Sequence, residues 1–368
     1  MKSITTTAYT RSVMLEDTSS ARQNHGVHTG ANQQLYLFDL VPAPQTFSLV
    51  SLFSGAGGMD LGFRGDFTSR GRYYEPNPFE IIWANELNPA ACRTYRRNVH
   101  GHIHEGDIWE YIETLPDHAD VVVGGFPCQD ISVNGKGAGI SGAKSGLYRA
   151  MVKAVELLNP RMFIVENVKA LNNKNHQDAF RIIKSDFEAH GYEVMHHLYN
   201  AADYGVPQTR ERMFIVGRRP EVSKFVHPAP ILHQHEWVTA HQAIGDLEHR
   251  ERDEAFSHTW SLAAVSGEQG NRHLKADRPG YTIRAEAHGN THWHYSLPRR
   301  MTNREAARIQ SFPDNFIFDA MLRETERMIG NAVPPVLAWH VARAVAESLH
   351  GQPILRGHSD PGLRTPQQ

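Results

Sequence analysis

The sequence predicts an α/β protein built on a doubly wound, mostly parallel sheet, with a second, smaller and irregular region. Short apolar runs rich in β-branched residues alternate with stretches whose apolar residues recur at helical spacing, which is typical of a parallel sheet covered by helices. A glycine-rich turn, residues 54–58, follows the first apolar run. The alternation stops after Gly217, where we expect the second region to begin. A chain of 368 residues is long enough for one large domain and one smaller domain.

The first half of the chain predicts four strands and two helices. The first strand leads into the glycine turn, which a short helix follows. Asn88 stands directly before a helical stretch and is a residue type that caps helix N-termini. The expected strands are 47–53, 79–84, one that ends at 106–107, and 119–125; the expected helices run through Leu61 and over 88–98.

The second half continues the pattern and then loses it. Leu147, Met151, Ala154, Val155 and Leu158 form the apolar stripe of an amphipathic helix. Between 220 and 275 the chain is polar, rich in His and Trp, and has no long periodic segment. The expected helices are 147–158, about 176–190, 302–312 and 335–349, and the expected strands are 161–166 and 212–217.

Composition predicts a cytoplasmic protein. Hydrophobic residues make up 40% and aromatic residues 9%, as in soluble globular proteins. No apolar run approaches the ~18 residues of a spanning helix, and the first 46 residues lack the layout of an export signal. Two cysteines cannot build a disulfide framework. The net charge is −2, yet residues 272–308 hold eight Lys and Arg against three Asp and Glu, which suits a DNA-binding face or an ordinary solvated surface.

Cys128 is the candidate nucleophile. It follows the apolar run 119–125, so it lies just beyond the carboxyl end of an expected strand, where open α/β sheets build their sites. The alternative is an ordinary small residue in a loop, since most lone cysteines are inert. The other cysteine, Cys92, falls within an expected helix and is expected in the core.

Three consecutive strand ends predict a nucleoside pocket. The glycine turn after Phe53 allows close approach of a ligand to the backbone, although a simple tight turn explains it equally well. Glu86, at the end of the second strand, is placed to accept hydrogen bonds from ribose hydroxyls. Asp107, at the end of the third, is placed to accept one from an adenine amino group.

Glu166 and two arginines complete the candidate site. Glu166 ends the strand after the Cys128 strand, so both residues are expected within reach of one small molecule; a helix-capping carboxylate is the alternative. Gln208, Arg210 and Arg212 alternate at the period of a strand and are expected on one face, where guanidinium groups suit a carbonyl oxygen and phosphates; a plain surface strand is the alternative. The numerous histidines lack the partners of a zinc site, and no metal is expected.

Eight short motifs follow one another along the chain in an order that is typical of one protein family. They are Phe53-Ser-Gly-Ala-Gly-Gly-Met-Asp-Leu-Gly-Phe63, Asn85-Glu86, Gly106-Asp107-Ile108, Gly125-Phe-Pro-Cys-Gln-Asp-Ile-Ser132, Glu166-Asn-Val168, Gln208-Thr-Arg-Glu-Arg212, Arg304-Glu-Ala-Ala-Arg-Ile-Gln-Ser-Phe-Pro313 and Gly330-Asn-Ala-Val-Pro-Pro335. In this order the chain resembles the DNA (cytosine-5) methyltransferase family of bacterial restriction-modification systems, from about Phe47 to Ala346.

The resemblance implies a Rossmann-like methyltransferase fold and assigns roles to the candidate residues. Cys128 would attack carbon 6 of a flipped-out cytosine, Glu166 would hold and protonate ring nitrogen 3, Arg212 would hold the base carbonyl, and Arg210 would support Cys128 or the backbone. The cofactor would be S-adenosylmethionine, held by Phe53, Gly55, Gly57, Glu86, Asp107, Leu147, Asn331 and Val333.

The resemblance also divides the chain. A poorly ordered extension, 1–46, would precede a catalytic and cofactor-binding domain, 47–217. Residues 218–300 would form the target-recognition domain, 301–350 would return to the catalytic domain, and 351–368 would be a disordered tail. The expected partner is double-stranded DNA, with a restriction endonuclease as an open functional counterpart. The protein is expected to be monomeric and not bound to a membrane.

Three rival functions remain at this point. A transfer RNA cytosine-5 methyltransferase would share the catalytic motifs, but the long variable stretch after Gly217 favours sequence-selective DNA binding. A catalytically inactive DNA-binding regulator would not need Cys128, Glu166, Arg210 and Arg212 together. A nicotinamide dehydrogenase would explain the opening strand and glycine turn but none of the later motifs.

Overall fold

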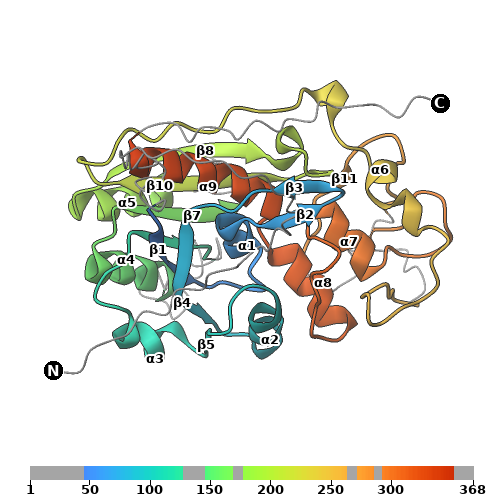
Figure 1. Cartoon of the computed structure of the whole chain (residues 1–368), viewed down its shortest axis with the longest axis horizontal. Helices are drawn as coiled ribbons and strands as arrows, with labels where there is room; N and C mark the ends of the chain where they lie inside the picture. The colour runs from blue at the N-terminus through green and yellow to red at the C-terminus, as the bar shows by residue number, and fades with distance from the viewer. Residues whose placement is uncertain (1–44, 127–145, 169–176, 263–271, 286–291, 352–368) are drawn as a thin grey trace, which may run out of the picture. The chain divides into compact units, whose positions relative to one another are not determined.

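A seven-stranded sheet forms the centre of the protein (Figure 1). The computed structural model describes residues 45–126, 146–168, 177–262, 272–285 and 292–351. Six strands of the sheet run in one direction, and β10 runs against both of its neighbours, β7 and β8. In spatial order the strands are β5 (His104–Glu105), β4 (Phe79–Glu86), β1 (Phe47–Leu52), β6 (Val121–Gly124), β7 (Met162–Val168), β10 (Glu211–Arg218) and β8 (Glu193–Asn200).

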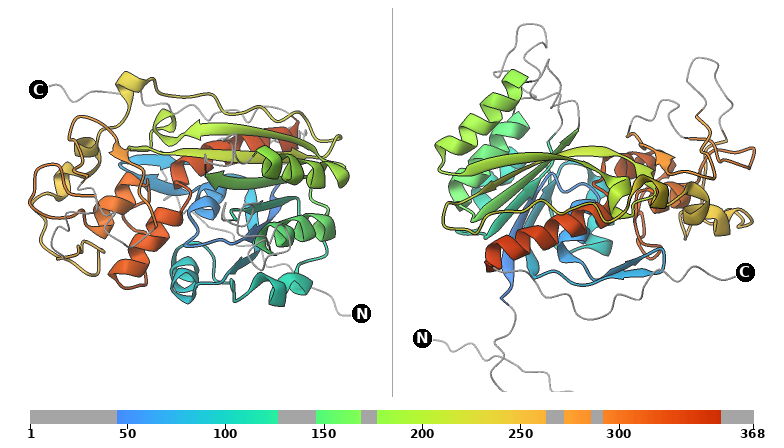
Figure 2. Two further views of the ribbon diagram at one scale, coloured as in Figure 1. Left: turned by 180° about the vertical axis from the view of Figure 1, so that it is seen from behind. Right: turned by 90° about the horizontal axis from the view of Figure 1, so that it is seen from above.

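Helices cover both faces of the sheet, because neighbouring strand residues point to opposite sides. On one face, Phe47 and Leu49 of β1 pack with α1 (Gly58–Arg64), α2 (Pro89–Asn98) and α9 (Pro335–His350). On the other face, Val50 and Leu52 pack with α3 (Ile108–Tyr111), α4 (Gly146–Leu158) and α5 (Gln177–Ala189). Figure 2 shows α9 on the opposite side of the sheet from α4 and α5. This arrangement confirms the predicted doubly wound, mostly parallel fold.

Local chemistry explains several element boundaries. The side chain of Asn88 accepts a hydrogen bond from the Ala91 N–H at 3.0 Å and so begins α2, as predicted. Thr302 and Glu305 form a capping box that begins α7 (Asn303–Ile309). Gly351, with φ 74°, ends α9 in the left-handed conformation that favours glycine.

The structure differs from the predicted strand that begins at Gln208. This run is split at Arg210, whose N–H donates to the Gln208 carbonyl at 3.0 Å and closes a tight turn. Gln208–Thr209 is therefore a separate short strand, β9, which pairs with β11 (Gly280–Tyr281), whereas β10 belongs to the main sheet. The strand β8, the hairpin of β2 (Phe67–Ser69) and β3 (Arg72–Tyr74), and the helix α8 (Leu322–Asn331) were not predicted.

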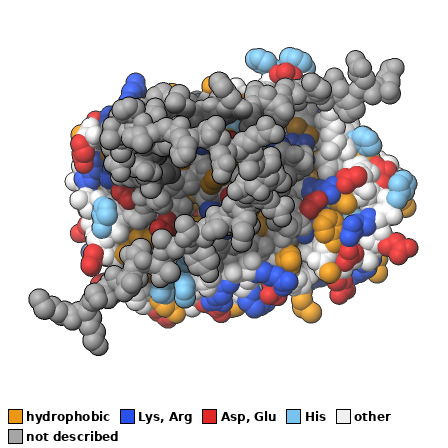
Figure 3. All heavy atoms as spheres, viewed as in Figure 1, with side chains coloured by type: hydrophobic (Ala, Val, Ile, Leu, Met, Phe, Trp, Pro, Cys, Tyr) orange, Lys and Arg blue, Asp and Glu red, His pale blue; other side chains and the backbone are white. Residues whose placement is uncertain are grey.

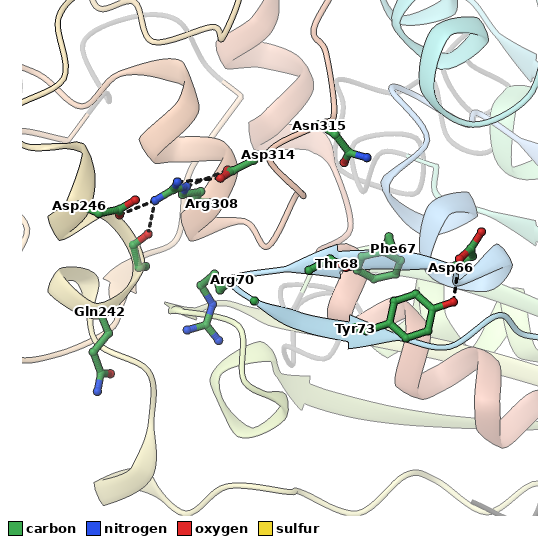
Figure 4. A pocket seen from close by; sticks show the side chains of 12 residues that line it. Asp66, Phe67, Thr68, Arg70, Tyr73, Gln242, Asp246, Arg308, Asp314 and Asn315 are labelled. Atoms are coloured by element: carbon green, nitrogen blue, oxygen red, sulfur yellow. Dashed lines mark hydrogen bonds and ion pairs between the residues drawn. The ribbon is translucent and has the colours of Figure 1, made fainter. Parts of the chain in front are cut away.

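Between Arg219 and Arg300 the described residues contain short elements. They are η8 (Gln234–Glu236), α6 (Ala240–Ile244), η9 (Gly245–Leu247) and β11, with isolated bridges such as Asp253 with His258. Arg308 of α7 pairs with Asp246 of η9 at 2.5 Å and with Asp314 at 2.7 Å (Figure 4). The Arg308–Asp246 pair connects the irregular region to the C-terminal segment at the wall of an open pocket of about 640 Å³. None of the candidate site residues lines this pocket.

Within the described ranges, no helix combines the length and the apolar character that crossing a membrane requires.

Candidate active site

The glycine turn after β1 has a strained backbone that leaves room beside it. Phe53 and Gly55 have φ of 56°, and Gly57 has φ of 88°. A non-glycine residue such as Phe53 seldom adopts this conformation, and such strain gathers at functional sites. A Cβ added to Gly57 would lie 2.5 Å from Val99 Cγ2, whereas one added to Gly55 would meet no atom within 4 Å. Gly57 is thus required for packing, and Gly55 faces open space at the predicted cofactor pocket.

Glu86 holds the turn in this shape. Its Oε2 accepts a hydrogen bond from the Gly55 N–H at 2.9 Å, and its Oε1 accepts one from the Asn88 N–H at 2.8 Å. Burial raises the pKa of this carboxyl, although the backbone donors of Asn88, Gly55 and Leu87 act to lower it. A carboxylate has about four acceptor sites, so three backbone donors leave Glu86 able to accept from a ribose hydroxyl as well.

Asp107 and Leu147 lie at the starts of two helices on the same side of the sheet. Asp107 caps α3, because its Oδ1 accepts a hydrogen bond from the Trp109 N–H at 3.0 Å. Leu147, in the first turn of α4, is half-buried and packs against the core below it, as Phe53 does. Polar and half-exposed apolar groups therefore surround the space above the carboxyl ends of the strands.

The C-terminal segment packs directly on the glycine turn. A Cβ added to Gly58 would lie 2.5 Å from the carbonyl oxygen of Val333, which is buried, while Asn331 is exposed. A Cβ added to Gly62 of α1 would lie 2.4 Å from the Cβ of Ala338 of α9. Residues far apart in the sequence thus share one side of the predicted cofactor pocket.

Glu166 and Arg212 form the charged centre of the candidate site. Arg212 Nε lies 2.8 Å from Glu166 Oε1, and both side chains are 12% exposed. Burial raises the pKa of Glu166 by more than the guanidinium groups of Arg212 and Arg210 lower it. A carboxyl with a raised pKa binds a proton more readily than an exposed one, and its oxygens can still accept directed hydrogen bonds.

The strand before Cys128 lies beside this carboxyl. Strands β6 and β7 are parallel neighbours, with Gly124 opposite Val165. A Cβ added to Gly125 would lie 3.2 Å from Glu166 Oε2. The Asn167 side chain donates to the Phe126 carbonyl at 3.0 Å and fixes the chain where it leaves β6. Cys128 itself, predicted as the nucleophile, lies outside the described residues.

Arg210 has a different environment from Arg212. It is 1% exposed, and its guanidinium donates to three backbone carbonyls: Ile283 at 2.8 Å, Gly330 at 2.8 Å and Ala332 at 3.1 Å. Desolvation lowers the pKa of Arg210 well below its ordinary value. This side chain therefore joins the irregular region to the C-terminal segment, and in the described structure it supports the backbone.

Sequence reasoning missed two groups that shape the site. Asn167 belongs to the motif Glu166-Asn-Val168, but no role is predicted for it from the sequence. Asp60 is fully buried in α1, where its carboxylate oxygens accept hydrogen bonds from Ser51 Oγ at 2.8 Å and Tyr95 Oη at 2.6 Å. The available signal was an aspartate between the apolar residues Met59 and Leu61, where a charge needs buried partners.

The second cysteine and the histidines take no visible part in the site. Cys92 is fully buried, its thiol donates to the Glu86 carbonyl at 3.3 Å, and burial raises its pKa to about 12. A thiol in this state is a poor nucleophile. Among the described residues, no three His, Cys, Asp or Glu side chains gather in a way that could hold a metal ion.

Comparison with known proteins identifies relatives of this chain. A family model described as C-5 cytosine-specific DNA methylase matches residues 47–262 and 239–347. Type II methyltransferase M.NgoFVII of Neisseria gonorrhoeae is 37% identical over 333 residues, which cover 81% of this chain and 86% of that protein. Type II methyltransferase M.BbvI of Brevibacillus brevis is 33% identical over 343 residues, which cover 81% and 90%.

Solved structures share the fold. A putative DNA modification methyltransferase encoded within a prophage of E. coli superposes with a TM-score of 0.63 at 21% identity, covering 83% of this chain and all of that one. The S. pombe Dnmt2 methyltransferase gives a TM-score of 0.61 at 18% identity, covering 83% and 99%. At these identities the likeness concerns the architecture alone.

Proposed function

This chain belongs to the C-5 cytosine-specific DNA methylase family and is a DNA methyltransferase of restriction-modification type, and from that premise we propose its chemistry in detail. It transfers a methyl group from S-adenosylmethionine to carbon 5 of a flipped-out cytosine within a specific sequence of double-stranded DNA, through a covalent intermediate on Cys128. The observation that carries this proposal is the Glu166–Arg212 pair, which lies beside Gly125, three residues before Cys128.

The pocket around the glycine turn fits the cofactor. Gly55 faces open space, Glu86 has acceptor capacity for ribose hydroxyls, and Phe53 and Leu147 offer half-buried apolar surface. When bound there, S-adenosylmethionine would supply an activated methyl group. The residues proposed to hold it are Phe53, Gly55, Gly57, Glu86, Asp107, Leu147, Asn331 and Val333.

The proposed mechanism overcomes the low nucleophilicity of carbon 5. The base is first rotated out of the duplex, at a cost of a few kcal/mol. The Cys128 thiolate then forms a bond to carbon 6, and the ring electrons shift toward carbon 5, which becomes nucleophilic and accepts the methyl group. Loss of the carbon 5 proton to a base restores the double bond and releases Cys128 as thiolate, and ring nitrogen 3 returns its proton to Glu166.

Glu166 and Arg212 stabilise the ring during these steps. Glu166, whose pKa is raised by burial, is proposed to donate a proton to ring nitrogen 3 as Cys128 adds, so that negative charge does not accumulate on the base. Arg212, held in place by Glu166, is proposed to hold the base carbonyl. We assign Arg210 a positioning role, because its three described acceptors are backbone carbonyls.

Residues 218–300 are proposed to choose the DNA sequence. Within them Arg300 lies 5.5 Å from the ring centre of Trp293, and Arg299 lies 5.0 Å from that of Trp260. These pairs pack the region itself, since Arg300 is buried and Arg299 donates to Glu305. The exposed cations Arg272, Lys275 and Arg278 are therefore the ones proposed to contact DNA. The proposed setting is the cytoplasm, with a monomeric enzyme acting on double-stranded DNA and a restriction endonuclease of the same specificity as its functional counterpart.

A methylation assay tests this function. The purified protein is incubated with a mixed-sequence duplex and S-adenosylmethionine, and 5-methylcytosine is then mapped. We expect methylation confined to one short sequence, and none by Cys128→Ala, while Cys92→Ala, as the matched control, retains activity. Methylation by Cys128→Ala above about a hundredth of the wild-type rate would rule out the covalent route. Methylation of transfer RNA in place of DNA would support the rival activity.

A further inference from the structure

One aromatic side chain beside the cofactor pocket has no part in the mechanism above. Trp109 is the second residue of α3 and is 45% exposed. The apolar residues close to it in the sequence, Ile108 and Ile112, are buried, with only 2% and 5% of their surface exposed. A large apolar ring that stays in water loses the free energy its burial would provide, so an exposed tryptophan beside a pocket points to a ligand.

Trp109 lies between Asp107, a predicted cofactor residue, and Gly146, which directly precedes another one, Leu147. The backbone N–H of Trp109 donates to Asp107 Oδ1 at 3.0 Å. This hydrogen bond fixes the backbone of Trp109 relative to the predicted adenine-binding carboxylate. On the other side, a Cβ added to Gly146 would lie 3.2 Å from Trp109 Nε1. The edge of the indole therefore touches the first residue of α4, directly before Leu147. The glycine at 146 allows the ring to lie this close.

We propose that Trp109 forms a wall of the adenine pocket and packs against the purine ring of the cofactor. The inference rests on the proposed use of S-adenosylmethionine, and it adds a binding residue that none of the eight motifs contains. Asp107 would read the amino group at the edge of the purine, and the indole would cover part of the ring. A flat, rigid aromatic surface suits this task because it stacks on a purine with little loss of side-chain freedom.

Fluorescence provides a direct test without DNA. The chain has six tryptophans, and Trp109 is the one that follows Asp107 by two residues and lies against Gly146, directly before Leu147. We expect S-adenosylhomocysteine and adenosine to quench the tryptophan emission, and methionine alone to leave it unchanged. Trp109→Phe should bind S-adenosylhomocysteine within about threefold of wild type but lose the quench. Trp109→Ala should bind it about tenfold more weakly, a loss of about 1.4 kcal/mol. Affinities are measured by calorimetry.

Trp237→Phe is the matched control, because Trp237 is half-buried in the irregular region and its Nε1 donates to Asp203 Oδ1 at 2.9 Å. It should keep both the affinity and the quench. If Trp109 only supports α4, then Trp109→Ala will unfold more readily but bind S-adenosylhomocysteine normally, and the quench will survive in Trp109→Phe. That result would overturn the inference alone. A wild-type protein that binds no S-adenosylhomocysteine would instead overturn the proposed function.

Discussion

At the scale of the residue, burial decides what each ionisable group can do. Glu166 and Arg212 keep 12% of their side chains exposed, so they can reach a substrate, whereas Arg210 and Asp60 are enclosed and act on the protein itself. The sequence was enough to predict Glu166, Arg210 and Arg212 as candidate site residues. Their different roles could not be predicted, because the backbone carbonyls that bind Arg210 belong to Ile283, Gly330 and Ala332, which are remote in the chain.

Glu166→Gln separates proton transfer from hydrogen bonding. The amide can still hydrogen-bond ring nitrogen 3 but cannot deliver a proton, so we expect the single-turnover rate of methyl transfer to fall by about 10²- to 10³-fold. The affinity for DNA should change little. Because the pKa of Glu166 is raised and its protonated form is required, the wild-type rate should fall as pH rises through that pKa, and the variant should lack this phase. A variant as active as wild type would exclude Glu166 as the proton donor.

Asp60 should make stability depend on pH. Burial raises its pKa from 3.8 to about 6 in the folded protein, so the folded state binds a proton that the unfolded state releases. This contribution is fully present below pH 3.8 and is lost as pH rises through about 6. Between about pH 5 and pH 7.5, wild type should therefore lose about 1 kcal/mol of unfolding free energy relative to Asp60→Asn. Urea unfolding of both proteins at several pH values measures this difference. If the unfolding free energies of the two proteins changed in parallel with pH, the raised pKa would not belong to Asp60.

At the scale of the element, periodicity and capping made the longer helices predictable from the sequence. The strands were harder to predict, because their bounds depend on which other strands they pair with. The helices predicted over 147–158 and 335–349 are observed as α4 and α9, each within one residue at both ends. The β2–β3 hairpin was missed because Arg70 occupies a turn position with φ 49°, where Asn or Gly is the usual signal. The split at Arg210 was missed because β9 and β10 find different partner strands.

The capping box of α7 should be worth more than that of α6. Thr302 is fully buried, its Oγ1 accepts from the Glu305 N–H at 3.0 Å, and Glu305 is also held by Arg299. Thr302→Ala leaves a buried donor unsatisfied, so we expect it to lower the unfolding free energy by about 2 kcal/mol. Thr239→Ala removes the same motif from α6 beside the exposed Gln242 and should cost about 0.5 to 1 kcal/mol. Equal losses in urea unfolding would contradict this reasoning.

At the scale of the whole molecule, the chain is predicted to divide cofactor binding from DNA binding. Figure 3 shows acidic and basic side chains interspersed over the described surface of one face, in keeping with a net charge of −2, so total charge does not mark a DNA surface. We propose that the exposed cations within the stretch from Arg272 to Arg308 mark that surface. Arg272, Lys275 and Arg278 in this stretch are exposed.

Two titrations on matched variants test this division: S-adenosylhomocysteine without DNA, and a duplex containing the methylated site without cofactor. Replacing Arg272, Lys275 and Arg278 together by Ala should weaken DNA binding and make its salt dependence shallower, by about one unit of log–log slope for each lost phosphate contact. Cofactor affinity should be unchanged. Glu86→Gln should do the reverse, because it disturbs the contact with the Gly55 N–H and the proposed ribose acceptor. If the triple variant lost cofactor affinity and kept normal DNA binding, the residues beyond Gly217 would belong to the cofactor site, and the proposed division would be wrong.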